Sequence, residues 1–280
     1  MSKVLLSIGH GYSAQALGRR LLPRGWRVIG TSRTAAGAGD SAQEVLCWPG
    51  SDLADALAAA SHLLISIPPA ADGDPVLLAL RDEIRQAASG LSWVGYLSTT
   101  AVYGDHRGGW VDEETPPAPT TERGHWRLAA ERAWQALAAE SGLPLHIFRL
   151  AGIYGPGRGP FAKLEAGKAR RIVKPGQVFS RIHVADLARV LHISMENPRP
   201  GAIYNVCDDK PAPPEDVIAH AARLLNLPVP PAEDFFTAEM SPLARHFYAE
   251  SKRVRNDRMK RELGFELLYP DYECGLASLL

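Results

Sequence analysis

One stretch decides the fold of this 280-residue chain: Val4-Leu5-Leu6-Ser7-Ile8-Gly9-His10-Gly11-Tyr12-Ser13-Ala14. Val4 to Ile8 is a short apolar run that ends at a glycine, which is typical of a buried strand. Residues 13–22 follow with apolar side chains at helical spacing, and Trp26 to Gly30 reads as a second strand. The order of strand, glycine turn, helix and strand predicts the first unit of a parallel α/β sheet.

The turn Gly9-His10-Gly11-Tyr12-Ser13-Ala14 fits the pattern GxGxxA. Its first glycine permits a tight turn, its second lets the backbone approach a pyrophosphate, and its alanine is small enough for close packing of helix on strand. Phosphates would lie at the start of the helix, where unpaired N–H groups and the helix dipole favour negative charge. The alternative is an ordinary strand-to-helix turn. We expect a bound dinucleotide, held by Gly9, Gly11, Tyr12, Ser13 and Ala14.

The end of the second predicted strand distinguishes the two nicotinamide cofactors. NAD-binding proteins usually carry Asp or Glu there, which holds the ribose 2′-hydroxyl. This chain has Thr31-Ser32-Arg33 instead, and its next carboxylate is Asp40. A hydroxyl and a guanidinium suit a 2′-phosphate. Ser32 and Arg33 therefore predict NADP, with NAD as the alternative if Arg33 is only a solvated loop cation.

The same alternation continues along the chain. It predicts strands near Val45-Leu46 and at His62–Ile67, Trp93–Ser98 and Leu145–Arg149, and helices near 52–60, 75–89 and 121–141. Such alternation is typical of an α/β fold with a doubly wound parallel sheet. After residue 150 the regular alternation of strands and helices ends, and short helices are expected near 184–196, 214–225 and 253–262. We expect a dinucleotide-binding domain over 1–150 and a smaller C-terminal substrate lobe over 151–280, from which residues near 178–206 can return to the main sheet.

Composition narrows the classes of function. Lys and Arg together number 31, as do Asp and Glu, so the surface as a whole does not favour nucleic acid. Three cysteines without CxxC spacing, and histidines that do not cluster, predict neither disulfides nor a metal site and suit the cytoplasm. No apolar run approaches the ~20 residues that span a bilayer, and no signal peptide is expected. We expect a cytoplasmic monomer or homodimer with a small-molecule substrate, and neither a nucleic-acid nor a membrane partner.

Further motifs follow the glycine turn in order. They are Leu97-Ser98-Thr99-Thr100-Ala101-Val102-Tyr103-Gly104, Arg149-Leu150-Ala151-Gly152-Ile153-Tyr154-Gly155-Pro156-Gly157 and Arg181-Ile182-His183-Val184-Ala185-Asp186-Leu187-Ala188. Together they resemble the extended short-chain dehydrogenase/reductase superfamily, in an atypical form, and within it the NAD(P)-dependent epimerase/dehydratase family. The resemblance covers nearly the whole chain. It implies a Rossmann-type sheet, with the cofactor across its C-terminal edge and a substrate lobe after about residue 150.

The resemblance also implies roles for single residues. Thr99 falls where the family's catalytic Ser or Thr hydrogen-bonds the reacting oxygen. The positions expected beside the cofactor path and the nicotinamide are Ser66, Ile67, Pro68, Leu150 and Gly152.

The chain departs from the family at its catalytic tyrosine and lysine. In the family these lie on the long helix as YxxxK, shortly before an Ala-Glu pair, and counting back from Ala130-Glu131 reaches Arg123 and Arg127. An arginine keeps its proton to above about pH 12, so it cannot exchange a proton as the phenol does. Arg127 can still hold the nicotinamide ribose. Arg123 is either a helix-surface cation or a clamp for a substrate carboxylate or phosphate.

Other residues are weaker candidates for chemistry. Tyr103 can reach the cleft from the loop after the fifth strand, whereas a structural hydrogen bond better explains His183. Thr100 and Ala101 stand where dehydratases carry an acidic pair, which disfavours sugar-nucleotide dehydration. The basic run over 252–261 is interpreted as a solvated helix face, with nucleic-acid binding as the alternative.

Two functions remain open at this point. The leading hypothesis is an NADP(H)-binding oxidoreductase or epimerase that acts on a small polar or nucleotide-sugar-like substrate, with Thr99, Arg123 and Arg127 in its active site. The alternative is a non-catalytic NADP(H) redox sensor or regulatory binding protein, which the loss of the tyrosine favours.

Overall fold

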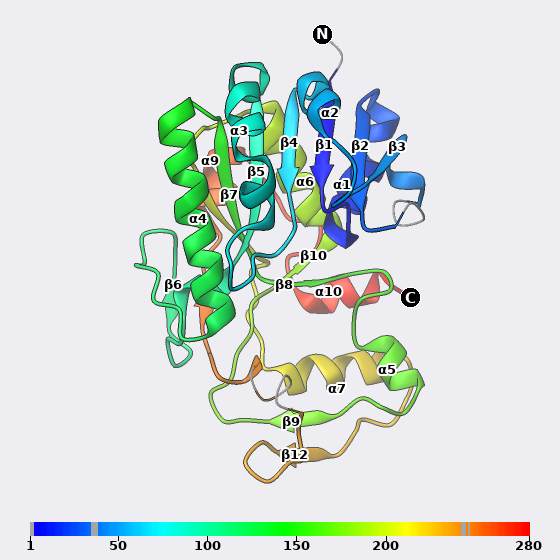
Figure 1. Ribbon diagram of the computed structural model, residues 1–280. Helices are drawn as coiled ribbons and strands as arrows, with labels where there is room; N and C mark the ends of the chain where they lie inside the picture. The colour runs from blue at the N-terminus through cyan, green and yellow to red at the C-terminus, as the bar shows by residue number, and fades with distance from the viewer. Residues whose placement is uncertain (1–2, 35–38, 242–244, 246) are drawn as a thin grey trace.

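The computed structural model describes residues 3–34, 39–241, 245 and 247–280. Its centre is a seven-stranded sheet in the order β11-β7-β5-β4-β1-β2-β3, in which every neighbouring pair is parallel (Figure 1). These strands are β1 (Val4–Ile8), β2 (Arg27–Ser32), β3 (Glu44–Cys47), β4 (His62–Ile65), β5 (Trp93–Thr99), β7 (Leu145–Leu150) and β11 (Ile203–Val206). The predicted α/β fold with a doubly wound parallel sheet is confirmed.

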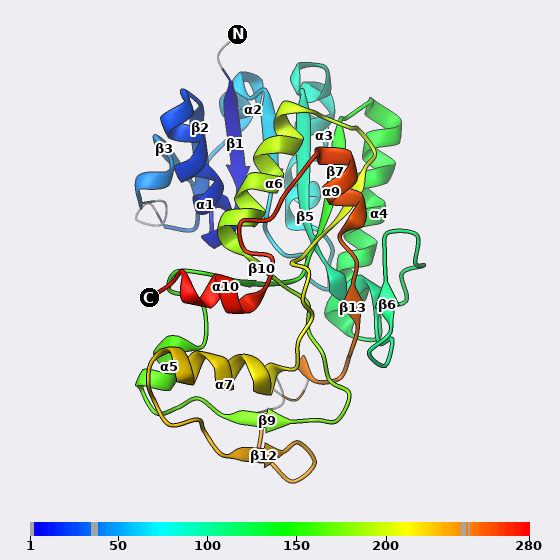
Figure 2. The same ribbon diagram turned by 180° about the vertical axis from the view of Figure 1, so that it is seen from behind.

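Helices cover both faces of this sheet (Figures 1 and 2). One face carries α2 (Ala54–Ala59), α3 (Pro75–Ala87) and α4 (Glu122–Ser141), and the other carries α1 (Tyr12–Leu21), α6 (Val184–Glu196) and α9 (Asp257–Leu263). Successive strand residues point to opposite faces, so Leu6 joins the first core with Ile84, and Leu5 joins the second with Leu17. No helix in the described part of the chain is both long and apolar enough to cross a membrane.

The strand order places a crevice between β1 and β4. The chain runs outward from β1 to β2 and β3, and then crosses to β4 on the other side of β1. In open α/β sheets, ligands bind outside the carboxyl ends of the strands at such a reversal of direction. Gly9 follows β1 and Ser66 follows β4, so both lie at this edge.

Residues after 150 contribute both to the sheet and to a separate lobe. β11 pairs with β7, and α6 packs against the sheet, whereas Val217, Ala221, Tyr272 and Leu276 form part of a third apolar cluster. Figure 1 shows this lobe facing the carboxyl ends of the strands. Its elements are β8 (Gly152–Tyr154), α5 (Phe161–Glu165), β9 (Arg171–Val173), β10 (Arg181–His183), α7 (Pro214–Leu224), β12 (Ala232–Asp234) and α10 (Tyr272–Ala277).

The helix predicted near 253–262 begins later than expected. Arg253–Val254 instead forms the short strand β13, which pairs with β6 (Trp110–Val111), and α9 begins at Asp257. The backbone N–H of Val254 donates to Oγ of Ser180 at 3.0 Å, so its hydrogen bond is made across the fold rather than within a helix. The first part of that helix prediction was therefore wrong, because tertiary contacts override local propensity.

Candidate cofactor and active site

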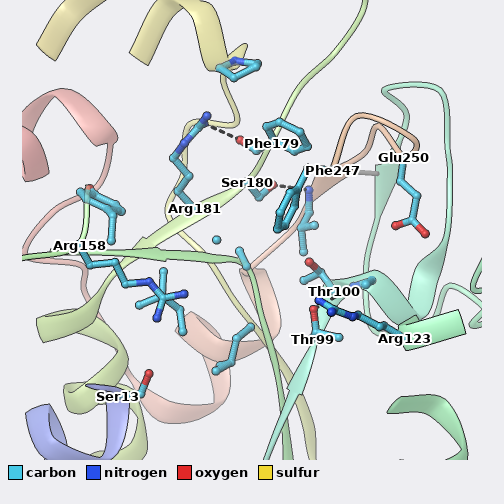
Figure 3. A pocket seen from close by; sticks show the side chains of 18 of the residues that line it. Ser13, Thr99, Thr100, Arg123, Arg158, Phe179, Ser180, Arg181, Phe247 and Glu250 are labelled. Atoms are coloured by element: carbon cyan, nitrogen blue, oxygen red, sulfur yellow. Dashed lines mark hydrogen bonds between the residues drawn. The ribbon is translucent and has the colours of Figure 1, made fainter. Parts of the chain in front are cut away.

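A cavity of about 1300 Å³ lies between the carboxyl edge of the sheet and the lobe (Figure 3). Its walls come from the start of α1, the segments after β4 and β5, the first turns of α4, and the lobe. Twelve of the residues expected in the site line it: Gly9, Gly11, Tyr12, Ser13, Ala14, Ser66, Pro68, Thr99, Arg123, Arg127, Leu150 and Gly152. Residues far apart in the sequence therefore meet in one space.

The glycine turn presents bare backbone to this cavity. Gly9 has φ +87°, and a Cβ there would lie 2.5 Å from Cγ1 of Ile67, so only glycine fits. A Cβ on Gly11 would meet nothing closer than the carbonyl oxygen of Gly9 at 3.9 Å, so the space above it is open. The N-cap residue of α1 is Gly11, which has no side chain to cap the helix, and the first turn over 12–15 holds no acidic residue. The first N–H groups of α1 consequently lack intrahelical acceptors and can bind an anion.

A buried histidine supports the turn from behind, and the sequence did not single it out. Nε2 of His10 lies 2.9 Å from Oγ of Ser41, and a Cβ on Gly30 of β2 would lie 2.8 Å from the His10 ring. Burial lowers the pKa of His10 to about 4, so the ring is neutral near pH 7. His10 therefore packs the turn against β2 and does not line the cavity.

The segment after β4 joins the turn from the other side. The hydroxyl of Ser66 donates to the carbonyl oxygen of Gly9, which ties the ends of β1 and β4 together. Ser66 and Pro68 line the cavity, whereas Ile67 packs beneath Gly9 against the apolar core. Ile67 thus shapes the turn from below, and it does not line the cavity wall.

The end of β2 lies outside the cavity wall. Ser32 is half-buried and Arg33 is exposed, and no carboxylate of the described residues pairs with the Arg33 guanidinium. Asp40, the nearest following carboxylate in the sequence, is held by Nε of Arg19 at 2.8 Å. The end of β2 therefore carries the Ser32 hydroxyl, followed by an Arg33 guanidinium that has no carboxylate partner among the described residues.

Thr99 and Thr100 lie where β5 passes into a short 3-10 helix, η5 (Thr100–Tyr103). Oγ1 of Thr99 accepts a hydrogen bond from the N–H of Ala101 at 3.2 Å, which fixes the side chain at the carboxyl end of β5. Because that bond uses a lone pair, the hydroxyl hydrogen of Thr99 stays free to donate. Both threonines line the cavity.

The two arginines of α4 differ in their surroundings. Nη1 of Arg127 donates to the Tyr96 hydroxyl at 3.0 Å and to the Leu97 carbonyl at 2.9 Å, so this guanidinium is anchored to β5. Arg123 is exposed, and no acidic side chain in the described ranges pairs with it. Figure 3 shows the Arg123 guanidinium pointing toward Thr99 and Thr100.

Tyr103, a candidate for the missing proton donor, is buried away from the cavity. Its hydroxyl donates to Oδ1 of Asn205 at 2.8 Å and accepts from Nη1 of Arg149 at 3.0 Å, and burial raises its pKa. The expected structural role of His183 is confirmed, because its Nδ1 accepts from the N–H of Ala185 at 3.2 Å and caps α6.

The basic run over 252–261 divides between two environments. In α9, Arg258 pairs with Glu114, and Lys260 pairs with Asp209, which agrees with a solvated helix face. Lys252 instead is buried and lines the cavity. Its Nζ donates to the Gly104 carbonyl at 2.7 Å and to Glu250 at 2.6 Å. Sequence reasoning missed this residue because only the folded chain brings it to η5.

Within the described ranges, no cluster of His, Cys, Asp and Glu has the arrangement of a metal site.

Comparison with known proteins agrees with this arrangement. Residues 76–207 match the NAD dependent epimerase/dehydratase family. The chain is 30% identical over 289 residues to Protein YeeZ of Escherichia coli (strain K12), covering 97% of each chain. A functionally unknown conserved protein from Silicibacter pomeroyi DSS has 59% identity and a TM-score of 0.93 over 99% of this chain and 98% of that one. UDP-glucuronic acid 4-epimerase from Bacillus cereus in complex with NAD shares the fold, with 16% identity and a TM-score of 0.77 over 98% and 96% of the two chains.

Proposed function

The chain belongs to the NAD-dependent epimerase/dehydratase family, and on this premise we propose that it binds NADP(H) and transfers hydride to or from a small polar or nucleotide-sugar-like substrate. The observation that carries the proposal is a shared cavity. The bare amides at the start of α1 and the hydroxyl of Thr99 at the end of β5 open into the same space. A dinucleotide along the sheet edge would span the distance between them.

The residues at the glycine turn fit the diphosphate of a dinucleotide. The open space above Gly11 admits a phosphate group, and the uncapped N–H groups of α1 supply donors for its oxygens. Ser66 and Pro68 would follow the cofactor along the sheet edge, and Leu150 and Gly152 would approach the nicotinamide. Ser32 and Arg33 support NADP over NAD, because a hydroxyl and an unpaired guanidinium suit a 2′-phosphate.

In the proposed mechanism, the nicotinamide supplies or accepts the hydride when it is bound. The Thr99 hydroxyl donates a hydrogen bond to the reacting oxygen, while its own oxygen accepts from Ala101. The proton that the reacting oxygen gains or loses with the hydride is exchanged with solvent water in the open cavity. Arg127, anchored on β5, would hold the nicotinamide ribose with its remaining N–H groups. Arg123 keeps the site positive and stabilises negative charge on the substrate, but it does not exchange a proton.

The test is a measurement of cofactor binding and turnover. We expect NADPH to bind more tightly than NADH, and absorbance at about 340 nm to change with some members of a panel of sugar nucleotides and small carbonyl compounds. Thr99→Val should lower the rate by about a hundredfold at unchanged NADPH affinity. The exposed Thr237→Val, outside the cavity, is the matched control. Absence of binding to any nicotinamide nucleotide would refute the proposal.

A second candidate is a non-catalytic NADP(H) sensor. Two observations favour it. Arg123 stands at the position of the family's catalytic tyrosine, and Tyr103 is buried outside the cavity, so neither position supplies a phenol to the site. NADPH binding with no turnover across the panel, together with a difference in proteolysis between the NADPH and NADP⁺ complexes, would support the sensor.

A further inference from the structure

The cavity is strongly electropositive although the protein is neutral overall. Lys plus Arg equals Asp plus Glu in the whole chain, at 31 each. Seven of the cavity-lining residues are Lys or Arg, namely Arg123, Arg127, Arg158, Lys163, Arg170, Arg181 and Lys252. Among the described residues, Glu250 is the only acidic one in the lining. A cleft lined by one sign of charge concentrates ligands of the opposite sign.

Most of these cations already have partners. Arg170 pairs with Glu233, and Lys252 pairs with Glu250. Arg181 donates to the carbonyls of Phe179 and Ala212 at 2.9 and 3.0 Å, and Arg127 is bonded to β5 as described above. Arg123, Arg158 and Lys163 have no carboxylate partner within the described part of the chain.

Of these three cations, Arg158 lies at the cofactor end and Lys163 lies in the lobe. The Arg158 guanidinium lies 5.4 Å from the centre of the Tyr12 ring, above the start of α1, and Lys163 follows in α5. Arg123 lies on the other side, in the first turn of α4, where a cation opposes the helix dipole. A Cβ on Gly124 would lie 3.1 Å from the Ala101 carbonyl, so this turn abuts η5. Arg123 is thus one unpaired charge beside the hydroxyls that follow β5.

The acceptors in the lining are mainly hydroxyl groups of Ser, Thr and Tyr, and few are carboxylates or amides. None of the described lining residues is Asp, Asn, Gln or His. Both oxygens of Glu250 are occupied, one by Lys252 and the other by the Thr120 hydroxyl at 2.7 Å. A hexose buried here would find few of the carboxylate and amide acceptors that form the strongest hydrogen bonds to sugar hydroxyls.

The substrate half of the cavity is instead largely apolar and aromatic. Phe179 and Phe247 line it together with Val217 and Ile218 of α7. Figure 3 shows Phe179 and Phe247 on the wall that continues from Thr100 toward Arg181. Phe247 is 65% exposed, so a flat apolar ligand that covers its ring would remove apolar surface from water.

We propose that the substrate is an organic acid that carries one carboxylate and, on a flat apolar body, the hydroxyl or carbonyl group that loses or gains the hydride. Its carboxylate binds the Arg123 guanidinium and the Thr100 hydroxyl, and its body lies against Phe179 and Phe247. A guanidinium beside a hydroxyl offers charge-assisted hydrogen bonds to both oxygens of a carboxylate. This inference rests on the proposed function and narrows its substrate class away from nucleotide sugars.

The test measures ligand affinity by calorimetry, with and without saturating NADP⁺, with trans-cinnamate as the probe. We expect cinnamate to bind about tenfold more tightly than the neutral, nearly isosteric cinnamamide. Arg123→Gln should remove this preference. Arg132→Gln, an exposed arginine of the same helix outside the cavity, should retain it. Phe247→Ala should weaken cinnamate several-fold, and the exposed Phe236→Ala should not.

Equal affinities for cinnamate and cinnamamide, or an unchanged preference in Arg123→Gln, would overturn the inference. So would tighter binding of phenyl phosphate or UDP-glucose than of cinnamate. NADPH binding is measured separately by its fluorescence. If NADPH binds and cinnamate does not, this inference fails alone, whereas failure of every nicotinamide nucleotide refutes the proposed function.

Discussion

Arg149 on β7 and Glu131 on α4 form an ion pair that is almost fully buried, with Nη2 and Oε2 2.8 Å apart. The Ser98 hydroxyl also donates to Glu131, and Ser98 immediately precedes Thr99. This pair joins α4, β5 and β7 directly behind the proposed active site. It therefore links the stability of the sheet edge to the position of Thr99.

Breaking this pair should be strongly destabilising. Arg149→Met leaves the Glu131 carboxylate buried without its cation, and we expect a loss of about 3–5 kcal/mol in the free energy of unfolding. The measurement is chemical denaturation followed by circular dichroism. Arg132→Gln, exposed on the same helix as Glu131, should change stability by less than about 0.5 kcal/mol. A loss in Arg149→Met no larger than that of the control would contradict a stabilising role for the pair.

The two glycines of the turn should respond differently to alanine. Gly9→Ala places a Cβ against Ile67 at a positive φ, so it should lower stability by about 1–3 kcal/mol. Gly11→Ala enters open space at φ −90°, so the protein should keep its melting temperature but lose NADPH affinity. Thermal melting and NADPH fluorescence separate the two effects. Full NADPH affinity in a folded Gly11→Ala variant would exclude close approach of a diphosphate at this position.

Arg33 should decide the choice between cofactors. Arg33→Ala removes the guanidinium that follows β2, which pairs with no carboxylate of the described residues, so NADPH affinity should fall about tenfold while NADH affinity stays the same. Titration of both cofactors into the variant measures this directly. Arg27→Ala is the matched control, because Arg27 lies on the same strand and pairs with Glu44 at the surface. Equal losses for both cofactors would show that Arg33 does not recognise the 2′-phosphate.

Buried histidines should make the fold sensitive to acid. Burial lowers the pKa values of His10, His62 and His146 from 6.5 to about 4. Between about pH 4 and 6.5 these histidines bind more protons in the unfolded chain than in the folded chain. The free energy of unfolding therefore decreases as the pH falls from about 6.5 toward 4. Denaturation at a series of pH values measures the slope of the free energy of unfolding against pH. It should decrease in His10→Gln, whereas the exposed His125→Gln should leave it unchanged.

The local parts of the fold and site could be predicted well. The turn Gly9 to Ala14, its strand and its helix lie within one short segment, and their apolar spacing and glycines directly encode the conformation. A structural hydrogen bond of His183 was also expected, and the structure shows that this bond caps α6. The short strand β13 was missed because its hydrogen bonds are made to β6 and Ser180, which lie far away in the sequence.

The sequence alone thus determined the doubly wound sheet and the place of the glycine turn at its edge, since helical and strand periodicity and glycine geometry are local properties. Only the tertiary structure decided what surrounds that turn. It buried Tyr103 with Arg149, anchored Arg127 on β5, left Arg123 unpaired, and brought Lys252 to the cavity. These environments depend on which distant charges and apolar side chains come within a few ångströms, and no single segment carries that information.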